Sequence, residues 1–350
     1  MSGLKAHLEL TNICNLECSY CPKYAMKRKL GYMDKNLAIR LIDELSGYGK
    51  SLEKVFFHLM GEPLMHPNFM ELVHYAVAKK IPLSLYSNGS LLNVDRIRAL
   101  LNSNLKELIV SFQTPAKDSF KLRKDSLGYD DYLENIKNLI LEKIKSESET
   151  RIELRILNTA KRNIFSLRFW FVDRNLDVFS DKGILKNFLA DLNQKLNKHS
   201  LHIDIQKVLG GISMRSSVFT AELFKGIFVV GTTYFSWYNF EDAKDPVFKK
   251  ARIGSCDGFM KQVGILWDGS VTSCCVDYNG DNVMGSVVNK SIREVLSSQK
   301  VIDFISKLKH CLLPTPYCRI CRGARKIRVL LMKQLGSIII FNLARIGEGK

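Results

Sequence analysis

The stretch Cys14-Asn15-Leu16-Glu17-Cys18-Ser19-Tyr20-Cys21 decides how this sequence is interpreted. It places three cysteines in the spacing C-x3-C-x2-C, just after a strand-like run at residues 6–11. Three thiolates on one tight loop can hold three irons of a cubane [4Fe–4S] cluster and leave the fourth iron open. Zinc usually needs four closed ligands. The triplet therefore predicts an iron–sulfur cluster, and three unrelated cysteines in a cytosolic loop are the alternative.

The length of the chain and the distribution of its cysteines predict two parts. With 350 residues, of which 46% are hydrophobic, the chain can bury a large core, and one α/β domain with a smaller appendage is expected. The nine cysteines lie towards the two ends, with none between Cys21 and Cys256. Because cysteines in a reducing compartment seldom form a disulfide framework, this clustering indicates metal binding.

The net charge of +17 suits nucleic acid, an anionic membrane surface, or a phosphorylated or nucleotide-linked substrate. The basic residues are spread along the chain, with a local concentration at residues 319–333. Without an aromatic RNA-binding motif, nucleic acid is not the favoured partner. The first dozen residues do not read as a secretory signal, and no run of about 18 apolar residues marks a membrane span. A cytoplasmic protein is therefore expected.

Strand-like and helix-like patterns alternate along the first two thirds of the chain. Strands are predicted at residues 7–11, 54–60, 83–87, 107–112, 151–157 and 201–206. Helices are predicted at residues 34–46, 68–79, 94–102, 129–145 and 181–198. Six β–α units predict an α/β fold, a partial (β/α)6 TIM-type barrel, followed by a small cysteine-rich C-terminal domain. Ligands of such sheets gather beyond the carboxyl ends of the strands.

Two further motifs follow predicted strands. Gly61-Glu62-Pro63 comes after the second strand, and Ser87-Asn88-Gly89 ends the third. Together with the cysteine triplet they resemble the radical S-adenosylmethionine (radical SAM) enzymes. The resemblance implies an open iron that chelates SAM, and an electron that cleaves SAM to a 5′-deoxyadenosyl radical. It also implies that Glu62 holds the SAM amino group in a GGEP-type motif, although Met60 replaces its first glycine.

The same resemblance suggests further contacts to SAM. Ser87 and Asn88 would line its pocket, and Ser111 and Gln113, at the end of the fourth strand, would contact its ribose. Arg123 would reach the SAM carboxylate, because a guanidinium suits bidentate carboxylate recognition. Tyr20 would pack near adenine. Simple turns, a surface arginine and a core aromatic are the ordinary alternatives for these residues.

Period-two alternation predicts a polar interior at the fifth and sixth strands. If Ile152, Leu154 and Ile156 face the helices, Arg151, Glu153 and Arg155 point inward, and His202, Asp204 and Gln206 do the same on the sixth strand. Buried charges need partners or a task. Arg155 and Asp204 are therefore the catalytic candidates, and a shifted register that exposes these groups to water is the alternative.

A second cysteine group lies in the last third of the chain. Its predicted ligands are Cys256, Cys274, Cys318 and Cys321, with an Asp268-Gly269 hairpin between the first two and a capped helix at residues 291–296. The arrangement resembles the SPASM or twitch extension of radical SAM enzymes, which holds an auxiliary [4Fe–4S] cluster. Cys275 and Cys311 are extra and could substitute as ligands. A structural zinc is the competing interpretation of this group.

These features predict a radical SAM enzyme that oxidises or otherwise modifies a small polar substrate, carbohydrate-like or anionic, with the auxiliary cluster as electron acceptor. A peptide maturase is the first alternative and RNA modification the second. A non-enzymatic zinc protein is the alternative of another class. A reductant such as flavodoxin or ferredoxin is an expected partner. The predicted parts are a core barrel at residues 1–218, a transition segment at 219–255, an auxiliary-cluster domain at 256–323 and a terminal segment at 324–350.

The terminal segment predicts a basic amphipathic helix over residues 326–346. Its apolar residues recur near helical spacing beside basic ones; they are Ile327, Leu330, Leu331, Leu335, Ile338 and Ile339. Packing against its own domain is the favoured interpretation. The alternative is peripheral contact with an anionic membrane surface.

Overall fold

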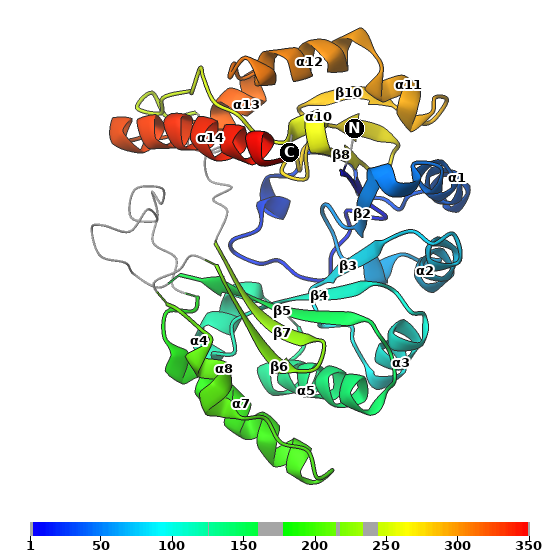
Figure 1. Cartoon of the computed structure of the whole chain (residues 1–350), viewed down its shortest axis with the longest axis vertical. Coiled ribbons are helices and arrows are strands. Elements are labelled where there is room, and N and C mark those ends of the chain that lie inside the picture. The colour runs from blue at the N-terminus through cyan, green and yellow to red at the C-terminus, as the bar shows by residue number, and fades with distance from the viewer. Residues whose placement is uncertain (1–2, 125, 160–177, 215–217, 234–243, 349–350) are drawn as a thin grey trace.

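The computed structural model describes residues 3–124, 126–159, 178–214, 218–233 and 244–348, except for the side chains of residues 342–348. One ten-stranded sheet runs through the molecule in the order β10-β9-β8-β1-β2-β3-β4-β5-β7-β6 (Figure 1). From β8 to β7, each strand lies parallel to its neighbour. The strands are β1 Leu4–Leu8, β2 Leu52–Phe57, β3 Leu83–Ser87, β4 Glu107–Gln113, β5 Arg151–Asn158, β6 Phe219–Phe224, β7 Ile227–Thr233, β8 Gln262–Ile265, β9 Ser270–Thr272 and β10 Val283–Ser286.

Helices follow the first strands, as the α/β fold class predicts. Helices α1, α2 and α3 lie along the outer side of the sheet, and α11, α12 and α14 lie at the end that carries β8 and β10 (Figure 1). The α-helices are α1 Lys35–Ser46, α2 Phe69–Ala78, α3 Val94–Asn102, α4 Lys117–Phe120, α5 Tyr129–Lys145, α7 Lys182–Asn197, α8 Ile205–Gly210, α10 Gly258–Lys261, α11 Ile292–Leu296, α12 Gln299–Lys309, α13 Pro316–Cys321 and α14 Ile327–Glu348. The 3-10 helices are η1 Pro22–Ala25, η2 Gly49–Ser51, η3 Pro63–Met65 and η4 Lys121–Arg123. No helix within the described ranges has the length and apolar character to cross a bilayer.

The two faces of the strands differ as period-two alternation requires. One face is fully buried and apolar, and it packs against the helices; it includes Val55, Leu85, Leu108, Ile152 and Leu154. The opposite face of the same strands lines the barrel interior, called the lumen below, and carries charged side chains such as Lys54, Glu107 and Glu153. The prediction that Arg151, Glu153 and Arg155 oppose the apolar residues of the fifth strand is confirmed.

The predicted sixth strand is wrong. Residues 201–204 form no strand, and α8 begins at Ile205. The Asp204 carboxylate accepts a hydrogen bond from the Lys207 backbone N–H (3.0 Å) and caps this helix. Asp204 is exposed, as are His202 and Gln206, so none of the three points into the lumen. Alternating apolar residues predicted a strand here, but a side-chain cap favours a helix start instead.

The sixth parallel strand is β7, which pairs with β5 from Ile152–Ile227 to Asn158–Thr233. It forms an antiparallel hairpin with β6, and Gly226 turns between them with φ +77°. Residues 219–233 were expected to lead out of the barrel, and they complete its sheet instead. The later part of that predicted transition, residues 234–243, lies outside the described residues.

The auxiliary hairpin continues the same sheet. β8 pairs with β1 from Lys5–Gln262 to Leu8–Ile265, and β9 pairs back on β8 around the Asp268-Gly269 turn. The predicted capped helix is α11, where Ser291 and Glu294 form a reciprocal capping box. The auxiliary part is therefore joined to the barrel by strand pairing.

Candidate active site

The cysteine triplet lies on a loop that folds back onto β1. The Cys21 backbone N–H donates to the Cys18 carbonyl (3.0 Å), and Lys23 donates from Nζ to the carbonyls of Cys14 (2.8 Å) and Leu16 (3.0 Å). The side chain of Asn12 bridges the two sides of the loop, since it donates to the Lys29 carbonyl and accepts from the Gly31 N–H. These bonds hold the three thiols at the carboxyl end of the first strand.

The thiols share one partly buried environment. Burial raises the pKa of Cys14, and the charges of Glu62 and Cys18 raise it further. Burial likewise raises the pKa of Cys21 to about 11, with Cys18 and Cys14 as added causes. The Asn88 side-chain amide points at the Cys14 sulfur from 3.8 Å. An all-sulfur donor set with an amide aimed at one sulfur fits an iron–sulfur cluster, because such hydrogen bonds tune these clusters.

Gly61 presses the second motif against the cysteine loop. Its φ is +75°, and a Cβ there would lie 2.3 Å from the Thr11 carbonyl oxygen and 2.7 Å from that of Ile13. The next residue, Glu62, donates its backbone N–H to the Ile13 carbonyl (2.8 Å). Only glycine permits this approach. The replacement of the preceding glycine by Met60, which is buried, leaves it intact.

Glu62 is 1% exposed, and its carboxylate is held by donors. It accepts from the backbone N–H of Asn88 (2.6 Å) and of Leu64 (3.3 Å), in the turn where Pro63 begins η3. Burial raises its pKa to about 7, opposed by these hydrogen bonds, by the Ser87 hydroxyl and by the charge of Arg123. Among the described residues no cation forms an ion pair with this buried carboxylate, and such a group is suited to receive one.

Asn88 joins the third motif to the first. Its amide nitrogen also donates to the Asn15 side chain (2.9 Å), while Ser87 accepts from the Gly89 N–H (3.0 Å). The sequence predicted Ser87 and Asn88 at the SAM pocket but not this bond between their loop and the cysteine loop.

Arg123 is buried and not a surface residue. Its guanidinium donates to the carbonyls of Ser111 (2.8 Å) and Asn88 (2.5 Å) and to the Tyr132 hydroxyl (3.0 Å). It thus ties the ends of β3 and β4 to α5. The structure assigns Arg123 a positioning role at the predicted SAM pocket, and its contact with the SAM carboxylate stays a prediction.

Gln113 and Tyr20 flank the same region. Gln113 ends β4 with φ +65° beside a bulge, an uncommon conformation for a residue other than glycine, and its buried Oε1 has no hydrogen-bond partner among the described residues. Tyr20 is buried next to Cys18, and burial raises the pKa of its hydroxyl. Their assigned contacts to ribose and adenine stay predictions.

The lumen contains residues that the sequence analysis missed. His58 stacks on Tyr86 (ring centroids 4.5 Å apart), and the Arg155 guanidinium lies 5.0 Å from the Tyr86 ring centroid. Burial and the charge of Arg155 lower the pKa of His58 to about 4, so its imidazole is neutral at neutral pH. The same alternation that identified Arg155 also predicts that Tyr86, on β3, and His58, directly after β2, point inward, although it was applied only to the fifth and sixth strands.

The four predicted auxiliary cysteines lie close enough for their charges to affect one another. They lie before α10 (Cys256), after β9 (Cys274) and on α13 (Cys318 and Cys321). Burial raises the pKa of Cys318 to about 12, and the charges of Cys256 and Cys321 raise it further. Burial also raises the pKa of Cys274 well above its usual range, and nearby thiols, among them Cys321 and Cys256, add to this effect. The Thr315 hydroxyl (3.2 Å) and the Asn282 amide (3.8 Å) both donate to the Cys318 sulfur.

The two extra cysteines differ in position. Cys275 is next to Cys274, and its charge is among the causes that raise the pKa of Tyr86, so it lies near that lumen residue. Cys311 follows α12 with φ +57°, and its carbonyl accepts from the Gly254 N–H (2.9 Å). Across the described ranges, no three His, Cys, Asp or Glu side chains are arranged to share a single metal ion.

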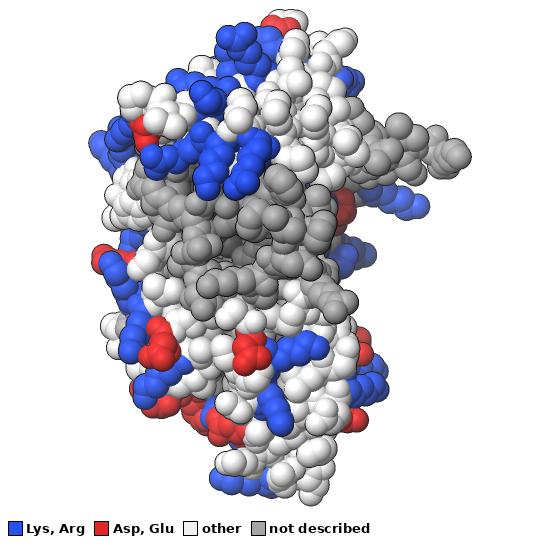
Figure 2. Space-filling view, turned by 90° about the vertical axis from the view of Figure 1, so that its left-hand side faces the viewer, with Lys and Arg blue, Asp and Glu red and all other residues white. Residues whose placement is uncertain are grey.

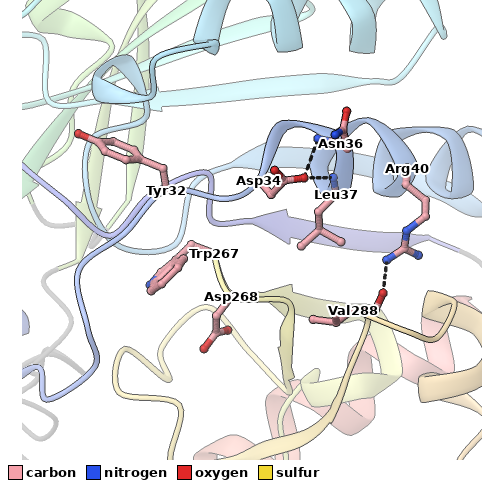
Figure 3. A pocket seen from close by; sticks show the side chains of 8 residues that line it. All are labelled: Tyr32, Asp34, Asn36, Leu37, Arg40, Trp267, Asp268 and Val288. Carbon is pink, nitrogen blue, oxygen red and sulfur yellow. Dashed lines mark hydrogen bonds between the residues drawn. The ribbon is translucent and has the colours of Figure 1, made fainter.

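A surface pocket of about 580 Å³ lies between α1 and the β8–β9 turn (Figure 3). Its walls include Tyr32 and Trp267, and Arg40 donates to the Val288 carbonyl at its far end. Trp267 packs directly on Gly31, where a Cβ would lie 2.6 Å from the indole ring. None of the motif residues described above lines this pocket, which is part of the junction between the cysteine loop and the auxiliary hairpin.

Two family models match the parts that carry these sites. The model of the Radical SAM superfamily matches residues 8–152, and that of SPASM, an iron–sulfur cluster-binding domain, matches residues 256–322. The chain belongs to the radical SAM superfamily. The radical SAM domain implies a [4Fe–4S] cluster and SAM, and the SPASM domain implies auxiliary iron–sulfur clusters.

The radical SAM chain is similar to several known proteins. It is 32% identical over 94 residues to a tungsten-containing aldehyde ferredoxin oxidoreductase cofactor-modifying protein of Pyrococcus furiosus, which is 27% of this chain and 26% of that protein. It is 28% identical over 193 residues to an S-adenosyl-L-methionine-dependent 2-deoxy-scyllo-inosamine dehydrogenase of Niallia circulans (54% of this chain, 74% of that protein). Its fold resembles the solved structure of native anSMEcpe with bound AdoMet, with a TM-score of 0.52, 15% identity and coverage of 99% of this chain and 98% of that one.

Proposed function

We propose that this enzyme oxidises or otherwise modifies a small polar substrate, carbohydrate-like or anionic, which binds in the lumen. The observation that carries the proposal is the layer formed by Arg155 on β5, Tyr86 on β3 and His58 directly after β2, which presents a cation, a phenol and a neutral imidazole. Such groups bind hydroxyls, amines and anions.

The assignment of the cofactor contacts is part of the proposal. Cys14, Cys18 and Cys21 would hold the cluster, and Glu62 would bind the SAM ammonium group. Once bound, the cluster and SAM would supply a carbon-centred radical that removes a hydrogen atom from the substrate, and the auxiliary cluster would take the remaining electron as a proton leaves. Gly61 and Arg123 hold the three motif loops against one another, so that the thiols and the Glu62 carboxylate would face the same cofactor.

A second layer of polar side chains lies in the lumen, nearer the amino ends of the strands. Glu107 accepts from Lys54 (2.9 Å) and Ser84 (2.8 Å), and Glu153 accepts from both Arg151 (3.0 Å) and Arg155 (3.0 Å). These five charged side chains comprise three cations and two carboxylates. The layer therefore fixes Arg155 and leaves the pocket slightly positive, which favours a polar or anionic molecule over an apolar one.

Cys256, Cys274, Cys318 and Cys321 are the proposed ligands of the auxiliary cluster. Their neighbour Cys275 is close enough to Tyr86 for its charge to raise the pKa of that phenol. This proximity supports an auxiliary cluster close enough to the substrate to accept an electron from it. The relative that acts on 2-deoxy-scyllo-inosamine makes an amino-substituted cyclic alcohol the first substrate to test.

The test measures whether a hydrogen atom is transferred from the substrate to 5′-deoxyadenosine. Anaerobically reconstituted enzyme would be given a reductant, SAM and carbon-deuterated 2-deoxy-scyllo-inosamine, other deuterated sugars, or short deuterated peptides. Deuterium in the recovered 5′-deoxyadenosine, with loss of two hydrogens from the cyclic alcohol or sugar, is the expected result. Deuterium that comes only from peptides would favour a maturase, and transfer from none of the small molecules would contradict the proposal.

The residue test uses Arg155. We expect Arg155→Leu to lower substrate turnover by about 10- to 100-fold, as for the loss of a hydrogen bond to a charged group, while SAM cleavage without substrate persists. Arg98→Leu is the matched control, because Arg98 pairs with Glu142 on the outer surface. Equal turnover by wild type and Arg155→Leu would contradict the proposal that the substrate binds in the lumen.

A further inference from the structure

Helix α14 has one face packed on the auxiliary part. Gln334 accepts from the backbone N–H groups of Arg252 and Ile253 (3.2 Å each), and Ser337 accepts from that of Ser255 (3.1 Å). Val329 and Leu330 are buried on this side. The prediction that the terminal helix packs on its own domain is therefore confirmed for this face of α14.

The opposite face of α14 is apolar and exposed. Ile327 (56% exposed), Leu331 (50%), Leu335 (54%) and Ile339 (57%) are spaced by four residues and so form one row along the helix. Single exposed apolar residues are common, but a continuous row of branched side chains on a terminal helix indicates an interaction surface. Nothing within the described ranges covers this row.

The charge around the row is mostly positive, although Asp245 forms an ion pair with Arg325. Residues 304–347 contain no aspartate or glutamate, and they carry Lys307, Lys309, Arg319, Arg322, Arg325, Lys326, Arg328, Lys333 and Arg345. Three of these are exposed at the start of α14, which is the positive end of the helix dipole and thus an unfavourable place for cations. An external anion at this position would offset that cost.

A neighbouring segment extends the basic surface. Lys249 pairs with Ala324 in an isolated antiparallel bridge, which lays residues 244–253 beside the start of α14. Lys249, Lys250 and Arg252 on this segment are exposed. Figure 2 shows Lys and Arg side chains gathered on the upper half of the molecule, the half that carries α14, next to uncharged surface.

We propose that the exposed face of α14, together with the basic segment 244–253, docks on an anionic lipid bilayer. The apolar row would lie just below the headgroups, and the flanking cations would contact lipid phosphates and carboxylates. A lipid surface is favoured because it satisfies both features. A nucleic acid would leave the apolar row in water, and an apolar protein partner would make no use of the basic side chains beside it. The proposal does not depend on the identity of the substrate.

Vesicle sedimentation of the full reconstituted chain tests this proposal. We expect binding to phosphatidylcholine vesicles that contain phosphatidylserine, little binding to phosphatidylcholine alone, and weaker binding as salt is raised. Either Leu331→Gln with Leu335→Gln, or Lys326→Gln with Arg328→Gln, should weaken binding by about tenfold or more. SAM cleavage in solution should be unchanged in both.

Matched controls separate this surface from general charge or hydrophobicity. Lys186→Gln with Lys198→Gln removes two exposed cations at α7, far from α14 (Figure 1), and Ile302→Gln removes an exposed apolar residue from α12. Both controls should bind vesicles like wild type. A thermal unfolding midpoint within the range of the controls shows that the α14 variants are folded.

Three results would overturn the proposal. The first is equal failure to bind both kinds of vesicle. The second is vesicle binding that the α14 variants retain. The third is self-association of the wild type in solution that Leu331→Gln with Leu335→Gln abolishes without any effect of lipid, which would make the occupant a second copy of the chain.

Discussion

Single residues set the contacts between the cysteine loop and the SAM motifs. Gly61 allows the second motif to touch the loop, Glu62 places a buried carboxylate beside Cys14, and Asn88 directs an amide to the Cys14 sulfur. Gly61 and Glu62 follow β2, Asn88 follows β3, and the cysteine loop that they contact follows β1, so the site depends on close packing between loops that are far apart in sequence. Substitutions at these positions have different expected effects on SAM binding, iron content and stability.

Glu62→Gln should weaken SAM binding by about tenfold or more, because a charge-assisted hydrogen bond to the SAM ammonium group is replaced by a neutral one. The iron content and visible absorbance should not change, since Glu62 is not a proposed iron ligand. Equilibrium binding of SAM to the reconstituted variant measures this. Glu53→Gln, at an exposed salt bridge with Lys5, is the control. A SAM affinity equal to wild type would exclude Glu62 from the site.

Gly61→Ala should destabilise the fold by at least about 2 kcal/mol, because it adds a strained positive φ to a close contact with the backbone of Thr11 and Ile13. Chemical denaturation of the two proteins measures the difference, and lower iron retention should accompany it. Gly210→Ala is the control, since a Cβ there meets nothing within 4 Å. If the two variants were equally stable, the contact between the motif loops would not be as tight as described.

At the scale of elements, the sequence predicts those whose pattern is local. The third strand and the helices at 94–102 and 129–145 have the predicted bounds, because alternation or helical periodicity coincides there with clear ends. The sixth strand could not be predicted from alternation alone. Residues 201–206 alternate, yet the cap by Asp204 and the two bonds between the Asn193 side chain and Ile203 set a different local structure. Which run joins a parallel sheet depends on tertiary pairing.

In the candidate active site, too, the sequence predicts local motifs but not the contacts between distant segments. The cysteines and the Gly-Glu-Pro and Ser-Asn-Gly motifs are short and local, so the sequence identifies them. The bonds that Arg123 makes to Ser111, Asn88 and Tyr132 join four segments, and no spacing along the chain indicates them. His58 and Tyr86 could have been identified by applying alternation to the second and third strands.

Asp204→Ala tests the corrected assignment of the region after α7. It should cost about 1 kcal/mol of stability, as for the loss of a helix cap, and should leave SAM cleavage and substrate turnover unchanged. Denaturation and the deuterium-transfer assay measure the two effects. A loss of turnover comparable to that of Arg155→Leu would return Asp204 to the catalytic candidates.

In the whole molecule, one sheet connects the two cysteine groups. Pairing of β8 with β1 joins them, and the buried Glu9 carboxylate accepts from Arg28 (2.8 and 2.7 Å) as well as from the Trp267 N–H of the auxiliary turn (3.2 Å). Burial raises the pKa of Glu9, and the bonds from Arg28 lower it. The auxiliary group is thus fixed relative to the barrel while its ligands remain separate from the first triplet.

Replacement of both Cys318 and Cys321 by alanine should therefore remove about half of the reconstituted iron, as expected for one of two four-iron clusters. SAM cleavage should persist, whereas substrate oxidation should stop for lack of an electron acceptor. Iron, sulfide and zinc analysis of the purified variant provides the measurement. Full iron retention would show that other residues are the ligands, and zinc in the wild-type protein at this group would support the structural alternative.

The central claim is that the Cys14, Cys18 and Cys21 loop carries the cluster that cleaves SAM. The most direct measurement is the formation of 5′-deoxyadenosine by reduced, anaerobically reconstituted enzyme, compared between wild type and a variant with all three cysteines changed to alanine. The account predicts product from the wild type and none from the variant, with the fold retained and the iron of the auxiliary group still bound. SAM cleavage by the triple variant at the wild-type rate would contradict it.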